Sequence, residues 1–242
     1  MVLPFTVLKY EPKTSVQKID GAALIVLQEW WGINDTIKAH AQHVSDATGL
    51  HVVLPDLYKG KVGLTAEEAS HLMNHLDWKV AIQELEQLTK ELRTEGYTKI
   101  GVMGFCMGGA LSLALASHAA QVEIPIQAAV ACYGIPPDNF DVTKITDATA
   151  IQGHFGGKDT MAGFSDPAAV DELERKLHHL KHVTLYRYPE QGHAFLNEDT
   201  WAIQKRKELG FVSKDIDPKL DEQSVRELAW SRITGFLVSH LK

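Results

Sequence analysis

The stretch KIGVMGFCMGGALSLALAS, residues 99–117, contains the pattern that decides the fold. Its first residues are mostly apolar, which is typical of a buried strand, and a strand is predicted over residues 98–104. Three glycines and one cysteine follow within a few positions. The alanine- and leucine-rich remainder favours a helix from about residue 107 to 117. The stretch therefore predicts a strand that turns directly into a helix around a single cysteine.

Cys106 stands at the centre of the pattern Gly-x-Cys-x-Gly that Gly104 and Gly108 complete. The pattern matches the nucleophile elbow, a sharp strand-to-helix turn, with cysteine in place of serine. Residues two before and two after the nucleophile approach closely in this turn, so side chains there would clash. The sulfur would lie at the positive end of the helix, which favours a thiolate, and the Met107 N–H would stabilise an oxyanion. The alternative, a small buried hydrophobic side chain, is our interpretation of Cys132.

Short apolar runs alternate with helical segments on both sides of this turn. Such alternation predicts βαβ units, and hence an α/β fold with a mostly parallel central sheet covered by helices on both faces. Helices are predicted over residues 33–49, 64–95 (as one helix or two), 107–117, 166–180 and 222–241. The remaining strands are predicted over residues 22–28, 50–56, 126–134, 148–156 and 182–189.

Candidate partners for the cysteine follow two later strands. Ligands bind at the carboxyl ends of the strands in such sheets, and this fold places its acid and then its histidine after the nucleophile. Asp159 and His193 stand in that order just beyond the strands predicted over 148–156 and 182–189. We expect His193 to take the proton of Cys106 and Asp159 to hold the imidazole in the correct tautomer. The weaker rivals are His154, Asp141, Asp147 and Asp166, since His154 precedes the acid and the aspartates suit capping roles.

Composition bounds the class of protein. The 242 residues suit one domain, residues 1–242, and the net charge of −7 argues against a nucleic-acid binder, which normally carries a basic face. No apolar run reaches the ~20 residues of a membrane helix, and no secretory signal is visible. Two cysteines make no disulfide framework, so we expect a reducing, cytoplasmic setting. His178 and His182 would share one helical face as a possible metal pair, but without a third ligand we interpret that face as solvated.

Five motifs in this order resemble the dienelactone hydrolase (carboxymethylenebutenolidase) family of α/β-hydrolases. They are VLQEWWGIND (26–35), VVLPDLYKGK (52–61), GVMGFCMGGA (101–110), HFGGKDTM (154–161) and YPEQGHAF (188–195). The resemblance implies an α/β-hydrolase fold and an acyl-enzyme formed on Cys106, with Asp159 and His193 in the roles given above. It also implies that Glu29 contacts the resting thiol and helps to deprotonate it, and that the Trp30 N–H joins that of Met107 in the oxyanion hole.

The expected substrate pocket departs from the family pattern. Members that act on dienelactone hold its carboxylate with arginines at two positions where this chain has Gly60 and Asn197. Lys59 or Lys61 could substitute for the first arginine only as a point charge. Residues 199–218 form a long segment before the last helix, interpreted as a lid or a contact surface. The residues expected to line the pocket are Trp31, Tyr58, Lys59 and Phe195.

The sequence thus predicts a cysteine-dependent hydrolase of a small-molecule ester or lactone. A broad carboxylesterase or a thioesterase with the same three residues is the nearest alternative, and a non-catalytic binding protein on the same fold is a further one. No cofactor, metal, nucleic acid or membrane is implied. We expect a monomer or a small homo-oligomer.

Overall fold

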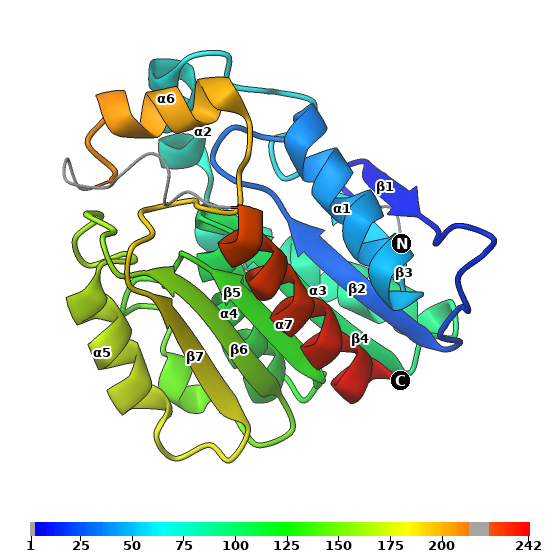
Figure 1. The fold of residues 1–242 in the computed structure, drawn as a ribbon. Helices are drawn as coiled ribbons and strands as arrows, with labels where there is room; N and C mark the ends of the chain where they lie inside the picture. Colours follow the sequence, from blue (N-terminus) through cyan, green and yellow to red (C-terminus); the bar gives the residue numbers. More distant parts are fainter. Residues whose placement is uncertain (1–2, 213–222) are drawn as a thin grey trace.

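The computed structural model describes residues 3–212 and 223–242. Its centre is a seven-stranded sheet with the order β1-β3-β2-β4-β5-β6-β7 (Figure 1). All neighbouring strands run parallel except β1, which pairs antiparallel with β3. The strands are β1 (Val7–Tyr10), β2 (Ala22–Leu27), β3 (His51–Pro55), β4 (Lys99–Phe105), β5 (Ala128–Cys132), β6 (Ala150–Gly156) and β7 (Val183–Tyr188). The mostly parallel sheet predicted from the sequence is therefore confirmed, whereas the short edge strand β1 was not predicted.

Two apolar cores lie on opposite faces of this sheet. Successive side chains of a strand point to opposite faces, so Leu24 and Val26 join one core and Ile25 and Leu27 join the other. The first core packs against α1 (Asp35–Thr48) and α7 (Gln223–Leu241), which cross the near face of the sheet in Figure 1. The second core packs against α3 (Trp78–Thr94), α4 (Met107–Gln121) and α5 (Pro167–Leu177).

Side-chain caps fix where several helices begin. Asn34 accepts a hydrogen bond from the Ile37 N–H at the start of α1, and Thr65 forms a capping box with Glu68 at the start of α2 (Ala66–His75). Asp77 caps α3. Each cap satisfies N–H groups that have no acceptor within the helix. The helical segment predicted over residues 64–95 is thus confirmed as two helices, because the chain leaves helical geometry between them.

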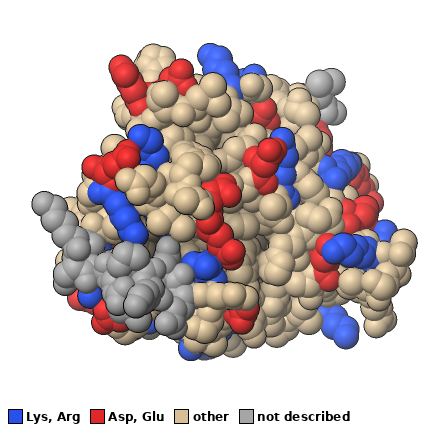
Figure 2. Space-filling view, turned by 45° about the horizontal axis from the view of Figure 1, so that its top comes forward, with Lys and Arg blue, Asp and Glu red and all other residues tan. Residues whose placement is uncertain are grey.

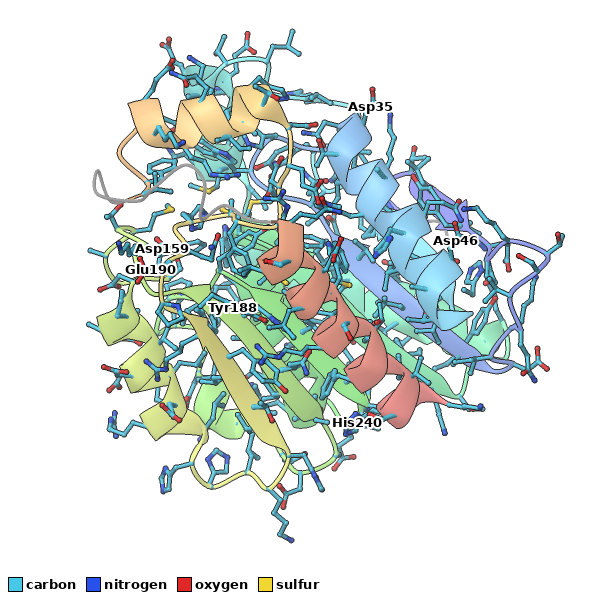
Figure 3. All side chains as sticks on the ribbon, in the orientation of Figure 1. Asp35, Asp46, Asp159, Tyr188, Glu190 and His240 are labelled. Atoms are coloured by element: carbon cyan, nitrogen blue, oxygen red, sulfur yellow. The ribbon has the colours of Figure 1, made fainter. Side chains whose placement is uncertain are left out.

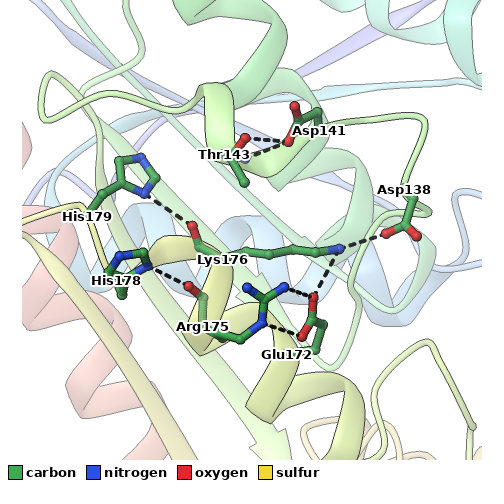
Figure 4. Close-up of polar contacts among 8 residues, drawn as sticks. All are labelled: Asp138, Asp141, Thr143, Glu172, Arg175, Lys176, His178 and His179. Carbon is green, nitrogen blue, oxygen red and sulfur yellow. Dashed lines mark hydrogen bonds and ion pairs between the residues drawn. The ribbon is translucent and has the colours of Figure 1, made fainter.

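His178 and His182 do not share a helical face, contrary to expectation. Helix α5 ends at Leu177, so His178 follows the helix and His182 lies beyond it, just before β7. His178 instead bonds the Arg175 carbonyl through Nδ1, beside the Arg175–Glu172 ion pair (Figure 4). Across the described part of the chain, no group of three or more metal-ligating side chains gathers at one place.

Two helices lie beyond the carboxyl ends of the strands. Figure 1 shows α6 (Thr200–Glu208) and α2 together at that end, above the sheet edge. Helix α6 belongs to the segment 199–218, of which residues 213–218 lie outside the described part. On the face that Figure 2 shows, basic and acidic side chains are interspersed, and neither forms a continuous patch. No helix among the described residues has both the length and the apolar character needed to cross a bilayer.

Candidate active site

Cys106 occupies the predicted sharp turn between β4 and α4. Its backbone has φ 54° and ψ −117°, a conformation that residues other than glycine rarely adopt. A Cβ atom on Gly104 would lie 2.2 Å from the Gly108 carbonyl oxygen. The backbone at Gly104 and Gly108 therefore approaches too closely for side chains at these positions, as predicted. The turn is held by the Cys106 N–H, which donates to the Cys132 carbonyl at 2.9 Å.

Gly134 supports the same turn from the next strand. A Cβ atom on it would lie 2.0 Å from the Cys106 carbonyl oxygen and 2.8 Å from the Ala110 nitrogen, both backbone atoms. We expect Gly134→Ala to lower the free energy of unfolding by about 1–3 kcal/mol, because the elbow must shift to make room. Urea unfolding measures the change. The control is Gly235→Ala on an exposed position of α7 with open space around it, which should gain about 0.5–1 kcal/mol. Equal behaviour of the two variants would contradict the steric account.

The structure brings Cys106, His193 and Asp159 together. The His193 Nε2 atom lies 3.2 Å from the Cys106 sulfur, and its Nδ1 atom lies 2.8 Å from an Asp159 carboxylate oxygen. All three side chains are buried. The second Asp159 oxygen accepts a hydrogen bond from the Met161 N–H, which fixes the carboxylate. Figure 3 shows Asp159 at the carboxyl end of the sheet, below α6.

The electrostatics of His193 follow from these contacts. Burial alone would lower its pKa, but attraction by Cys106 and Asp159, with hydrogen bonds to both, raises the pKa to about 10. Ser165 also places its hydroxyl 3.1 Å from the His193 Nδ1 atom. The imidazole is thus suited to accept and hold a proton that leaves the neighbouring sulfur.

The rival residues lie in other contacts. The His154 ring bonds the Tyr188 hydroxyl and the Gln152 side chain, and burial lowers its pKa to about 3. The aspartates accept backbone N–H groups elsewhere: Asp141 from Thr143, Asp147 from Lys181, and Asp166 from Gly163. The structure therefore groups none of these four residues with Cys106.

Glu29 belongs to a buried polar network beside the cysteine. Its carboxylate accepts hydrogen bonds from the Tyr133 hydroxyl at 3.4 Å and from the Asn197 side-chain amide at 3.1 Å. The backbone carbonyl of Asn197 accepts a hydrogen bond from the Arg206 guanidinium at 3.1 Å. Burial raises the pKa of Glu29, while the Arg206 charge and the Asn197 hydrogen bond act to lower it.

This network differs from the contact expected between Glu29 and the thiol. Among the described residues, no hydrogen bond joins Glu29 to Cys106, whose sulfur faces His193 instead. The sequence did not identify Tyr133 or Arg206 as site residues. Tyr133 has a positive φ of 41° and follows β5, so its place after a strand was the one available signal. Arg206 carries no such signal, because only the tertiary position of α6 brings it to the site.

The two expected oxyanion donors lie at the appropriate strand and helix ends. Met107 is the first residue of α4, where N–H groups have no acceptor within the helix. Trp30 follows β2, and the close packing of Gly108 against the Leu27 and Gln28 carbonyls holds this loop at the start of α4. In the described part of the chain, neither the Trp30 nor the Met107 N–H donates to a backbone carbonyl. The assignment of both N–H groups to an oxyanion hole stays a prediction.

A cavity of about 140 Å³ opens beside the cysteine. Helices α2 and α6 and the chain after α6 form its outer walls. The segment after α6 is tied to the acid loop, since Val212 forms a β-bridge with Asp159, and Thr160 donates to the Gly210 carbonyl at 2.5 Å. The lining residues are Glu29, Trp30, Trp31, Met73, Cys106, Met161, Phe164, His193, Ala194, Asn197, Ala202, Arg206, Leu209 and Phe211.

Three of the four residues expected to line this cavity do not do so. Trp31 lines it, as predicted. Tyr58 is buried in the core beneath α4, with its hydroxyl 3.3 Å from the Met107 sulfur. Lys59 is directed outward and pairs with Glu84 at 3.0 Å, and Phe195 packs into the core against Tyr188. The predictions for Tyr58, Lys59 and Phe195 were wrong because position in a loop does not fix the direction of a side chain.

The two cysteines should differ strongly in reactivity. Cys106 lines the cavity beside a basic imidazole, whereas Cys132 is fully buried in β5 and burial raises its pKa. We expect iodoacetamide to modify Cys106 roughly 100-fold faster than Cys132 in the folded protein, because only an accessible thiolate reacts. Peptide mapping over time measures both rates, and unfolding in urea should remove the difference. Equal rates in the folded protein would contradict the site.

Comparisons with known proteins place these observations in a family. The model of the dienelactone hydrolase family matches residues 5–241. The protein usf of Aquifex pyrophilus is 30% identical over 75% of this chain and 79% of its own length. The carboxymethylenebutenolidase of Pseudomonas putida is 26% identical over 60% of this chain and 64% of its own length. The structure of dienelactone hydrolase from Anabaena variabilis, 20% identical, superposes with a TM-score of 0.59 over 96% of this chain and 90% of that one. The α/β-hydrolase fold is thereby confirmed.

Proposed function

Because the chain belongs to the dienelactone hydrolase family, we propose that it hydrolyses small-molecule esters or lactones through an acyl-enzyme on Cys106. The observation that carries this proposal is the continuous contact from sulfur to imidazole to carboxylate at the edge of a cavity. The Cys106–His193 and His193–Asp159 distances of 3.2 and 2.8 Å suit proton transfer. A thiol needs such a base to become an effective nucleophile.

In the first half of the reaction, His193 Nε2 takes the thiol proton and the sulfur attacks the ester carbonyl carbon. The carbonyl π electrons move to its oxygen, which the Met107 and Trp30 N–H groups stabilise. When the carbonyl re-forms, the carbon–oxygen bond to the alcohol breaks and His193 gives its proton to the leaving oxygen. An ester gives a free alcohol and a thioester on Cys106, whereas a lactone gives one opened chain that is bound to Cys106 as a thioester and carries the new hydroxyl group.

In the second half, water replaces the alcohol. His193 takes a proton from the water as its oxygen attacks the thioester carbonyl. The carbon–sulfur bond then breaks, which releases the carboxylic acid, and His193 returns its proton to the sulfur to restore the cysteine thiol. Asp159 stabilises the imidazolium in both halves by accepting a hydrogen bond from its Nδ1–H group. No further reactant is needed.

Glu29 is proposed to act on the same thiol. Its carboxylate and the Cys106 sulfur line one cavity, so a carboxylate that approached the thiol would accept its proton. Glu29→Gln should alter the pH dependence of Cys106 alkylation. An unchanged profile would remove Glu29 from the mechanism.

A cytoplasmic setting is also proposed, because a reducing compartment keeps a nucleophilic thiol free.

A hydrolysis panel tests the proposed function. It contains lactones, p-nitrophenyl esters and acyl thioesters, each assayed with the wild type and with Cys106→Ala as the control. We expect hydrolysis of at least one class that depends on Cys106. Faster hydrolysis of thioesters than of oxygen esters would identify a thioesterase with the same triad. Binding of panel compounds without turnover would identify a non-catalytic binding protein and contradict the proposal.

A further inference from the structure

The cavity beside Cys106 is almost entirely apolar. Aromatic and aliphatic side chains form its walls, among them those of Trp31, Phe164 and Phe211. Besides Cys106 and His193, the polar side chains that line it are those of Glu29, Asn197 and Arg206. A substrate group that enters here must leave water. The charge balance among these few polar groups therefore decides which substrates are favoured.

Arg206 is the one cationic side chain among the described lining residues apart from His193, and it is already engaged. The guanidinium is largely buried, with 8% of the residue exposed, and donates to the Asn197 carbonyl. The Asn197 amide holds the Glu29 carboxylate, which is also 8% exposed. One asparagine thus places a cation and an anion against the same cavity, and the charge of Arg206 offsets that of Glu29.

Two lysines near the site are not among the described residues that line the cavity. Lys59 pairs with Glu84, and Lys158 pairs with Glu190 at 2.8 Å. Asn197 stands where the family pattern has an arginine and is turned toward Glu29. A carboxylate on the substrate would therefore meet Glu29 without an uncommitted cation from the described lining residues. It would also lose its hydration, which is costly for an ion.

We infer that this cavity selects uncharged, ring-sized apolar groups on the ester and discriminates against substrates that carry a carboxylate there. The inference rests on the proposed function. The volume of about 140 Å³ sets the size, since an apolar cavity of about 150 Å³ is known to hold benzene. Glu29 supplies the anion at this cavity, and Arg206 of α6, bonded to the Asn197 backbone carbonyl, is a positioning residue whose charge offsets that of Glu29.

The test compares two matched esters, 4-acetoxybenzamide and 4-acetoxybenzoate, which differ mainly in charge. The readout is the ratio of their kcat/KM values, each corrected for the rate of hydrolysis by hydroxide. A ratio within one variant cancels losses that affect both esters equally. We expect the wild type to favour the amide by about tenfold or more, because the benzoate must lose its hydration in an apolar cavity where no uncommitted cation among the described lining residues replaces it.

Two variants should move this ratio in opposite directions. Glu29→Gln removes the anion and leaves the Arg206 charge uncompensated, so the ratio should fall about tenfold. Arg206→Gln removes the cation, so the ratio should rise. Lys59→Gln is the matched control, because Lys59 lies outside the cavity, and its ratio should equal that of the wild type.

Each outcome decides the inference. A wild type that hydrolyses both esters equally well, or prefers the benzoate, overturns it. An unchanged ratio in Glu29→Gln and Arg206→Gln overturns the assignment to these residues. Failure of the proposed function looks different: neither ester would then be hydrolysed in a way that Cys106→Ala abolishes. The inference is supported only when Cys106-dependent hydrolysis favours the amide and both variants shift the ratio as expected.

Discussion

Replacing Cys106 with alanine is expected to lower kcat/KM for ester hydrolysis by about 10⁴-fold or more, the size of loss seen when a nucleophile is removed. Without sulfur, no side chain at this turn can form the acyl intermediate. The imidazole and oxyanion donors remain, but they have no nucleophile to activate. Steady-state assays with a substrate from the hydrolysis panel measure the loss.

The matched control for this prediction is Cys132→Ala. Cys132 is also buried, but it lies in β5 and is not among the residues that line the cavity. We expect this variant to retain activity, so that general loss of a cysteine is excluded as the cause. Thermal unfolding of both variants shows whether each is folded. Substantial activity in a folded Cys106→Ala protein would refute the proposed mechanism.

Asp159→Asn is expected to lower kcat by about 10³–10⁴-fold while preserving the fold. The Asp159 carboxylate accepts a hydrogen bond from the Nδ1–H group of His193, which leaves Nε2 free to take the proton of Cys106. An amide that presents its NH₂ group to Nδ1 favours the opposite tautomer, so Nε2 would carry a proton and could not act as a base. Single-turnover and steady-state rates separate this effect from changes in binding.

Asp141→Asn provides the control for the Asp159 variant. Asp141 caps the short 3₁₀ helix Val142–Lys144, away from the cavity, and its loss should not change the rate. A residual activity above about a tenth of wild type in Asp159→Asn would contradict the assigned role, since a tautomer error costs far more.

The sequence was most informative where local pattern decides the structure. The apolar run before Cys106 and the glycines around it report a strand, a close backbone approach and a helix start within a few residues. The order of Asp159 and His193 after two later strands was sufficient to place both loops, because parallel strands bring their carboxyl ends to one sheet edge. These residues meet in the structure as predicted.

Features that depend on tertiary packing could not be predicted in the same way. Arg206 is one of several basic residues in α6, and only the position of that helix turns it into a buried cavity residue. Phe195 and Tyr58 lie in the expected loops, but their rings are buried in the two apolar cores on opposite faces of the sheet. Asn197 was recognised as a departure from the family pattern. Its hydrogen bond to Glu29 is visible only in three dimensions.

The central claim is that Cys106 carries the acyl group during turnover, and a trapped intermediate tests it most directly. The enzyme is mixed with a p-nitrophenyl ester of a slowly hydrolysed aromatic acid, quenched in acid during the initial burst, and analysed by intact mass and peptide mapping. We predict a burst of one nitrophenolate per chain and one acyl group on the peptide that contains Cys106, with both absent in Cys106→Ala. An acyl group on another residue, or a burst that persists in Cys106→Ala, would contradict the claim.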